Sequence, residues 1–172
     1  MTSILQSFLH LAKIKFTKTY LNQLALVHPN KNNMLGLKQM LDVYGIKTEG
    51  VKYEDNLLAE LVFPCILHIS GGFVVGKDLE NDTITYIYGD KEVKKGVEDF
   101  CLIWTGHALL PTANFSSAIE PNYVSNRKAE IIKLIGKTLL CILPLFIWGM
   151  AFLRRHQNIS VYSCIDTILE WI

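Results

Sequence analysis

The first part of the chain carries apolar residues at the spacing of an α-helix. In residues 1–27 these positions repeat mostly every three or four residues, with lysines between them. The spacing predicts an amphipathic helix whose apolar side packs on a soluble domain. A helix lying on a membrane surface is the alternative. The apolar positions are Leu5, Phe8, Leu9, Ala12 and Phe16, and the lysines are Lys13, Lys15 and Lys18.

A second helix is predicted after the polar loop at residues 28–33. Asn32 or Asn33 can cap its first turn, because an asparagine side chain there accepts a hydrogen bond from a free backbone N–H. Gly45 followed by Ile46 is typical of a helix end with its hydrophobic contact. The buried side of this helix is predicted to consist of Met34, Leu37, Leu41 and Tyr44.

Beyond this helix the pattern changes to that of β-strands and turns. Runs of β-branched and aromatic residues predict strands, and Ser70-Gly71-Gly72 is a hairpin signal. The predicted elements are a short strand at Val51 and Tyr53, a short helix at 54–61, strands at 65–69, 73–76, 83–88, 91–95 and 104–110, and one helical turn at 97–101. Two or three helices followed by four or five antiparallel strands make an α+β fold.

A long apolar segment, residues 131–153, follows the predicted domain, and its only charged residues are Lys133 and Lys137. As a helix it measures roughly 35 Å, enough to cross a ~30 Å hydrocarbon core. Pro144 lies in its middle, where a membrane helix tolerates proline better than a soluble helix does. We expect one transmembrane helix here. The alternative is a buried core helix, which a chain of 172 residues is too short to surround.

The chain is therefore expected to consist of a soluble domain at 1–112, a linker at 113–130, the membrane helix at 131–153 and a short tail at 154–172. Basic residues before the apolar segment outnumber those after it, and no export signal is recognised at the start, so we expect the N-terminal domain in the cytoplasm and the helix in the inner membrane. Counted from the uncharged run at 138–153 within the segment, the basic residues are Arg127, Lys128, Lys133 and Lys137 before this run, and Arg154 and Arg155 after it.

Charge and cysteine content exclude several classes of protein. Lys and Arg total 17 and Asp and Glu total 16, so the chain is nearly neutral and its overall charge does not favour nucleic-acid binding. None of the four cysteines is part of a C-x-x-C pair, and no His/Cys cluster has zinc-site spacing, so neither a metal nor a cofactor is expected. The cysteines are Cys65, Cys101, Cys141 and Cys164.

Five motifs occur in a characteristic order within residues 20–112. They are a helix ending in Tyr-Gly-Ile at 37–46, a Pro-led strand at 63–70, Phe-Val-Val at 73–75, a Tyr-Ile strand at 86–90 and a Trp-Thr-Gly strand at 104–110. This order resembles the bacteriocin-processing cysteine peptidases, which act on double-glycine leader peptides. The resemblance implies a papain-like peptidase fold, usually found at the N-terminus of peptide-exporting ABC transporters.

The same resemblance implies where a catalytic site would lie. In that family an imidazole takes the proton of a cysteine thiol, and an aspartate orients the imidazole. Aligning the helix end places Asn32 at the nucleophile and Gly72 at the base, with Asp90 one residue beyond the third position. Since Asn32 cannot form a thiolate and Gly72 cannot accept a proton, we expect no hydrolysis by the family mechanism. The peptide-binding candidates are His28, Asn32, Gly71 and Gly72.

Other residues are not expected to replace the missing groups. Cys65 and His68 are three apart in a predicted strand, so their side chains face opposite sides of the sheet. Ordinary sheet packing is the preferred interpretation of these two residues and of Cys101 and His107. An active cysteine peptidase that processes double-glycine leaders with an unaligned thiol is the alternative.

A second resemblance concerns the membrane helix. His28-Pro29-Asn30, Trp104-Thr105-Gly106 and the linker at 120–137 resemble bacterial proteins of the vitamin K epoxide reductase family. In those proteins a degenerate peptidase-like domain precedes a membrane-embedded thiol oxidoreductase, so the resemblance implies a truncated or split version here. We expect a membrane-anchored, catalytically inactive peptidase-like domain. Its expected partners are a peptide or leader segment, the lipid bilayer, and a membrane oxidoreductase or transporter subunit.

Overall fold

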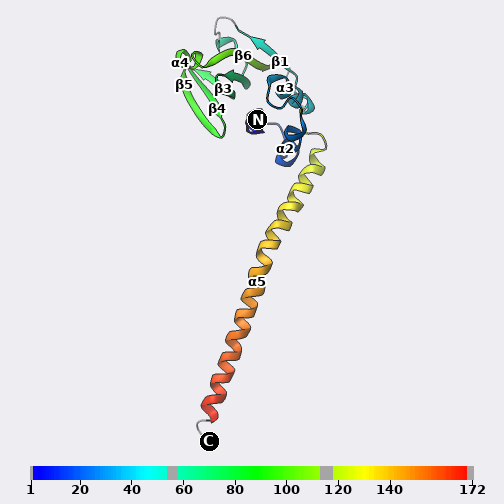
Figure 1. Cartoon of the computed structure of the whole chain (residues 1–172), viewed down its shortest axis with the longest axis vertical. Coiled ribbons are helices and arrows are strands. Elements are labelled where there is room, and N and C mark those ends of the chain that lie inside the picture. The colour runs from blue at the N-terminus through cyan, green and yellow to red at the C-terminus, as the bar shows by residue number, and fades with distance from the viewer. Residues whose placement is uncertain (1, 54–57, 113–117, 170–172) are drawn as a thin grey trace. The chain divides into compact units, whose positions relative to one another are not determined.

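The computed structural model describes residues 2–53, 58–112 and 118–169, with side chains up to Arg154 (Figure 1). The chain forms two compact units, Met1–Arg127 and Lys128–Ile172. The first contains the sheet and the shorter helices, and the second contains most of one long helix.

Two helices, α1 (Thr2–Leu11) and α2 (Lys18–Val27), form where the sequence predicts one. The helix α1 ends because Lys13 adopts a left-handed conformation with φ 56°. The N–H of Lys13 then donates to the carbonyl of His10, and the N–H of Ile14 to that of Leu9. These bonds form a Schellman end, which usually has glycine at the position of Lys13. The single-helix prediction was wrong because no glycine marks this end.

The helix α3 (Met34–Val43) begins and ends as predicted. Its N-cap is Asn33, whose side chain accepts a hydrogen bond from the N–H of Gly36 at 2.8 Å. At the other end Gly45 has φ 81°, and the N–H of Ile46 donates to the carbonyl of Leu41. Gly45 allows the left-handed turn, and Ile46 is fully buried beyond it.

Six antiparallel strands form one sheet in the order β1-β6-β2-β3-β4-β5. The last strand of the chain therefore lies between the first and the second. The sheet joins the predicted short strand near Val51 to the predicted run of four or five antiparallel strands. The other elements of this region are the 3₁₀ helix η1 (Leu58–Glu60) and α4 (Val97–Cys101). The strands are β1 (Thr48–Lys52), β2 (Cys65–Ile69), β3 (Gly72–Glu80), β4 (Thr83–Tyr88), β5 (Lys91–Gly96) and β6 (Trp104–Pro111).

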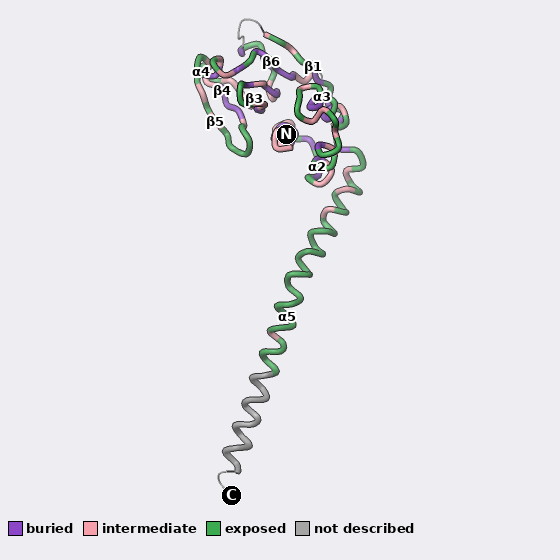
Figure 2. Tube along the Cα trace, in the orientation of Figure 1, coloured by how far each residue is buried: buried purple, intermediate pink, exposed green. Residues whose placement is uncertain are grey.

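Each face of the sheet supports a separate hydrophobic core. On one face, Ile66, Val75 and Leu109 pack with α1, α2 and α3. On the other face, Cys65 and Leu67 pack with residues of η1 and α4. Successive residues of β2 thus alternate between the two cores, as the period of a strand requires. Within the first unit, buried positions accordingly gather in the short helices and central strands (Figure 2), and the predicted α+β fold is confirmed.

A buried carboxylate joins the start of α2 to the segment that leads into the long helix. Glu120 is 1% exposed. It accepts hydrogen bonds from the backbone N–H and the hydroxyl of Thr17, the latter at 2.8 Å, and from the side-chain amide of Asn126 at 2.8 Å. Thr17 is the N-cap of α2 and accepts from the N–H of Tyr20. A carboxylate near a helix N-terminus also stabilises the helix dipole.

The long helix α5 (Tyr123–Leu169) contains the predicted membrane segment and Pro144. Among the described residues, it is the one helix long and apolar enough to cross a membrane, over Tyr123–Arg154. The hydroxyl of Thr138 donates to the carbonyl of Leu134 at 2.9 Å, so this polar group is satisfied within the helix.

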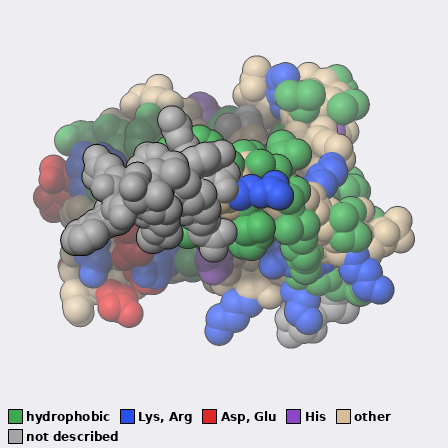
Figure 3. Space-filling view, turned by 90° about the horizontal axis from the view of Figure 1, so that it is seen from below, with side chains coloured by type: hydrophobic (Ala, Val, Ile, Leu, Met, Phe, Trp, Pro, Cys, Tyr) green, Lys and Arg blue, Asp and Glu red, His purple; other side chains and the backbone are tan. Residues whose placement is uncertain are grey.

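Charged side chains are unevenly distributed over the molecule. In Figure 3 the visible Asp and Glu side chains lie in the left part of the view, and Lys and Arg side chains are visible in both parts. Residues 1–41, in the first unit, contain five lysines and no aspartate or glutamate. These residues form α1, α2 and most of α3.

Candidate functional site

Asn32 is positioned by a loop that folds tightly over the start of α3. Within this loop the N–H of Asn30 donates to Nδ1 of His28 at 3.2 Å, and the N–H of Asn33 donates to the carbonyl of Asn30 at 3.2 Å. A Cβ added at Gly36 would lie 1.8 Å from the carbonyl oxygen of Asn30. Only glycine at this position lets the loop approach so closely.

Gly71 and Gly72 are positioned by the hairpin between β2 and β3. His68 pairs with Phe73 and Ile69 with Gly72, which leaves Ser70 and Gly71 as the turn. The N–H of Ser70 donates to the carbonyl of Ile103 at 2.8 Å and holds the turn against the end of α4. Gly72 has φ 125°, and no atom lies within 4 Å of a Cβ added there. The space that a side chain would occupy at residue 72 is therefore open.

These two segments meet at one pocket of about 540 Å³. Asn32, Gly71 and Gly72 line it together, although forty residues separate Asn32 from Gly72 in the sequence. Asp90 is exposed and does not line the pocket, but its neighbour Gly89 does. The lining residues are Ser3, Ile4, Asn32, His68, Gly71, Gly72, Phe73, Tyr88 and Gly89.

His28 is the one peptide-binding candidate that does not line this pocket. Its ring nitrogen Nδ1 accepts the hydrogen bond from Asn30 described above, so its proton in the neutral form is on Nε2. In the structure His28 supports the loop that carries Asn32. Its contact with a peptide stays a prediction, as do the binding roles of the other three candidates.

His68 lines the pocket, whereas the sequence was interpreted as placing it in ordinary sheet packing. Its Nδ1 lies 2.8 Å from the hydroxyl oxygen of Thr105, and that hydroxyl donates to the carbonyl of His68 at 2.9 Å. The Thr105 hydroxyl has one proton for these two contacts, so the tautomer of His68 determines which group donates. In the tautomer whose Nδ1–H donates to Thr105, Nε2 is unprotonated and can accept a hydrogen bond. The only signal available from the sequence was that His68 lies two residues before the predicted hairpin turn Ser70-Gly71-Gly72.

The described cysteines have no arrangement for nucleophilic catalysis. Cys65 is fully buried in the core beneath the sheet, and burial raises the pKa of its thiol far above the ordinary value. Burial also raises the pKa of Cys101, which packs against the same core. Cys141 lies on α5, and the side chain of Cys164 is outside the described residues. A thiol that stays protonated is a poor nucleophile, and none of these described cysteines lines the pocket.

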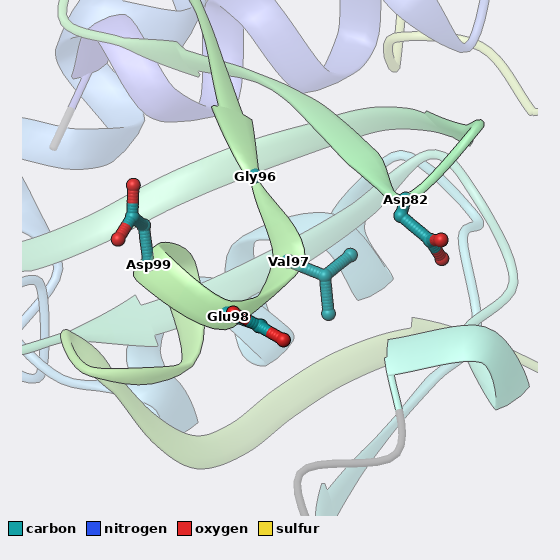
Figure 4. Close-up of a pocket in the computed structure, with 5 residues that line it drawn as sticks. All are labelled: Asp82, Gly96, Val97, Glu98 and Asp99. Carbon is teal, nitrogen blue, oxygen red and sulfur yellow. The ribbon is translucent and has the colours of Figure 1, made fainter.

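A second pocket, of about 520 Å³, lies beside α4 and is lined by acidic residues. Figure 4 shows that the carboxylates of Asp82, Glu98 and Asp99 point in different directions, so they do not form a common ligand set. Among the described residues, no group of three or more His, Cys, Asp and Glu side chains is suited to hold a metal ion.

Comparison with known proteins identifies the domain that contains the first pocket. The family model for the peptidase C39 family matches residues 2–116. The chain belongs to the peptidase C39 family. No curated protein matches the chain significantly. The order of motifs in the sequence predicted this family, and the match confirms that prediction at the level of the family and its fold.

Solved structures of C39 domains agree with this assignment. A double glycine motif protease from an AMS/PCAT transporter, crystallised in complex with the leader peptide, is 28% identical with a TM-score of 0.56, and the match covers 64% of this chain and 83% of that one. The peptidase domain of Streptococcus ComA, a bi-functional ABC transporter involved in a quorum sensing pathway, is 23% identical with a TM-score of 0.52 and coverages of 63% and 88%. The second match shows the fold alone.

Proposed function

We propose that this chain is a catalytically inactive C39 domain that binds a peptide and is anchored to a membrane by α5. The observation that carries the proposal is that Asn32 and Gly72 line one pocket in a C39 fold. These are the positions at which the family alignment expects the nucleophile and the base. The side-chain amide of Asn32 cannot form a thiolate, and Gly72 has no side chain that could accept a proton.

The pocket retains groups that suit an extended peptide. Gly71 and Gly72 leave space in the lining, and Nε2 of His68 can form a hydrogen bond with a peptide backbone group. The side chains of Asn32 and Tyr88 add further donors and acceptors to the lining. We propose a double-glycine leader segment as the ligand, because a C39 relative was crystallised in complex with a leader peptide. Two consecutive glycines pass through a narrow site without side-chain clashes.

A titration tests peptide binding directly. A synthetic leader-like peptide ending in Gly-Gly is titrated calorimetrically into the full chain in nanodiscs. We expect saturable binding that Asn32→Trp weakens at least about tenfold, since a bulky side chain at the pocket rim blocks the ligand. Asn22→Trp, at an exposed position of α2, is the matched control and is expected to bind as the wild type does. Absence of binding to any leader-like peptide, or equal binding by both variants, would contradict the proposal.

The proposed domain organisation is a peptidase-like domain at 1–112, a linker at 113–130, a membrane helix at 131–153 and a tail at 154–172, with the domain on the cytoplasmic side of the inner membrane. The length and apolar character of α5 support the anchor, and the excess of basic residues before the segment supports the orientation. Protease added outside intact spheroplasts is expected to leave the domain uncut. Cleavage of the domain by that protease would show that the domain lies on the outer side of the membrane and would contradict the proposed orientation.

The proposed partner in the membrane is a thiol oxidoreductase or a peptide transporter subunit. The likeness of His28-Pro29-Asn30 and Trp104-Thr105-Gly106 to vitamin K epoxide reductase fusions supports the first. The transporter origin of the C39 relatives supports the second. Cross-linking in native membranes distinguishes them, because only the oxidoreductase carries a C-x-x-C pair and only the transporter a nucleotide-binding domain.

A further inference from the structure

Three exposed lysines lie beside the point where the chain enters α5. Lys15 forms a parallel bridge with Ile119, and the N–H of Glu120 donates to the carbonyl of Lys15 at 3.3 Å. Lys13 and Lys18 flank Lys15 in the same segment, and all three side chains are exposed. We call Lys13, Lys15 and Lys18 the basic surface.

The acid nearest to the basic surface in this segment is turned inward. Glu120 is the one acidic residue in 118–129, and it is buried by its bonds to Thr17 and Asn126. Neither of the ion pairs Lys47–Asp42 and Lys77–Glu92 involves the basic surface. The surrounding residues 1–41 contain no acid at all. The exposed charge here is positive.

The length of α5 brings this charge within range of a membrane. A crossing takes about 20 residues, which, counted back from Arg154, reaches Leu134 and leaves Lys133 at the near edge of the hydrocarbon. The helix between Lys133 and Tyr123, where α5 begins beside the basic surface, is then roughly 15 Å long at 1.5 Å per residue. The headgroup layer extends roughly 5–7 Å outward from the hydrocarbon core and leaves a gap of roughly 8–10 Å. Unpaired surface charges act over about 8–10 Å in physiological salt. The headgroup layer therefore lies within the electrostatic range of the end of the domain.

We propose that the basic surface docks on anionic lipid headgroups of the same membrane that α5 crosses. This inference rests on the proposed anchoring, because it requires α5 to be in a bilayer. Three lysines near an anionic surface favour the docked domain by on the order of 100-fold over the same domain on a neutral surface. Docking restricts the orientations that the domain can adopt at the membrane.

Lysine reactivity tests the contact residue by residue. The full chain is placed in nanodiscs of phosphatidylcholine alone, or with about one third phosphatidylglycerol, and acetylated with a limiting amine reagent before mass spectrometry. We expect acetylation of the basic surface to slow severalfold in the anionic discs and to recover in about 0.5 M salt, where screening is strong. Lys91 and Lys94, exposed on β5, are internal controls and are expected to react equally in both discs.

A pair of variants separates docking from general effects of charge. In Lys15→Gln/Lys18→Gln, Lys13 is the reporter and is expected to lose its lipid-dependent protection. In the matched control Lys91→Gln/Lys94→Gln, Lys13 is expected to keep it. If the chain incorporates into both discs and the basic surface is acetylated at the same rate in both, the docking inference is overturned and the anchoring proposal remains intact. Failure of the chain to incorporate into discs of either composition overturns both.

Discussion

At the scale of single residues, the proposal of an inactive, peptide-binding site rests on the residues that line the pocket. Asn32 and Gly72 line it where the family alignment expects a thiol and an imidazole, and His68 lines it from the neighbouring strand. The space beside Gly72 is open, so no neighbouring side chain fills the position where the family alignment expects the imidazole. The proposed site therefore has room for a ligand, and neither Asn32 nor Gly72 has a side chain that can act as a thiolate or an imidazole base.

Restoring both groups should restore a reactive thiol. We predict that Asn32→Cys/Gly72→His is alkylated by iodoacetamide near pH 6 at least about tenfold faster than Asn32→Cys/Gly72→Ala, because a neighbouring imidazole lowers a thiol pKa. The alanine variant carries the same backbone strain at φ 125° but no imidazole. Equal alkylation rates of the two variants would show that residues 32 and 72 do not form a catalytic pair.

Cys65 should make the fold less stable in alkaline solution. Burial holds the pKa of this thiol above its ordinary value of 9.0, so the unfolded chain loses the proton first as the pH rises above 9.0. The free energy of unfolding then falls with pH, by at most about 1.4 kcal/mol per pH unit. Urea denaturation followed by Trp fluorescence at several pH values measures the slope. Cys65→Ala should show a smaller slope between pH 9.0 and 10.0, below the ordinary pKa of tyrosine; an unchanged slope contradicts the assignment.

At the scale of elements, the Glu120 carboxylate links α2 to the first turn of α5. Thr17 and Asn126 both donate to it, and the same carboxylate faces the N-terminus of α2. Buried donors that lose their acceptor cost more than an average hydrogen bond contributes. The stability of α2 should therefore depend on this one side chain.

We predict that Glu120→Ala destabilises α2 by about 1–3 kcal/mol, because it leaves the donors of Thr17 and Asn126 unsatisfied. Glu120→Gln keeps one oxygen acceptor and should cost less. Hydrogen exchange of the α2 amides is the measurement, and Glu49→Ala, an exposed position on β1, is the control. Exchange of α2 that is the same in Glu120→Ala and in the control would contradict this role.

Some ends and neighbours of the elements could be predicted from the sequence, and others could not. The end of α3 was predictable because Gly45 and Ile46 are a strong local signal. The end of α1 was not, because Lys13 adopts the left-handed conformation without glycine. The insertion of β6 between β1 and β2 depends on contacts between distant segments, which local periodicity does not contain. His68 was assigned to packing because its place in the pocket depends on how the hairpin lies against the loop of Asn32.

At the scale of the whole molecule, a C39 domain is followed by a helix long and apolar enough to cross a membrane. The order of five weak motifs sufficed to predict the family, since order over nearly a hundred residues is more specific than any one motif. The proposed lack of peptidase activity is inferred from the side chains of Asn32 and Gly72, and a functional test measures it directly.

Incubation of the full chain in nanodiscs with a synthetic double-glycine leader peptide tests the central claim most directly. Mass spectrometry follows the peptide, with calorimetry to confirm that it binds. We predict saturable binding with the peptide intact, because no thiolate and imidazole meet at residues 32 and 72. Cleavage after the double glycine that disappears when Cys65, Cys101, Cys141 and Cys164 are replaced by alanine would contradict the account and identify an active peptidase.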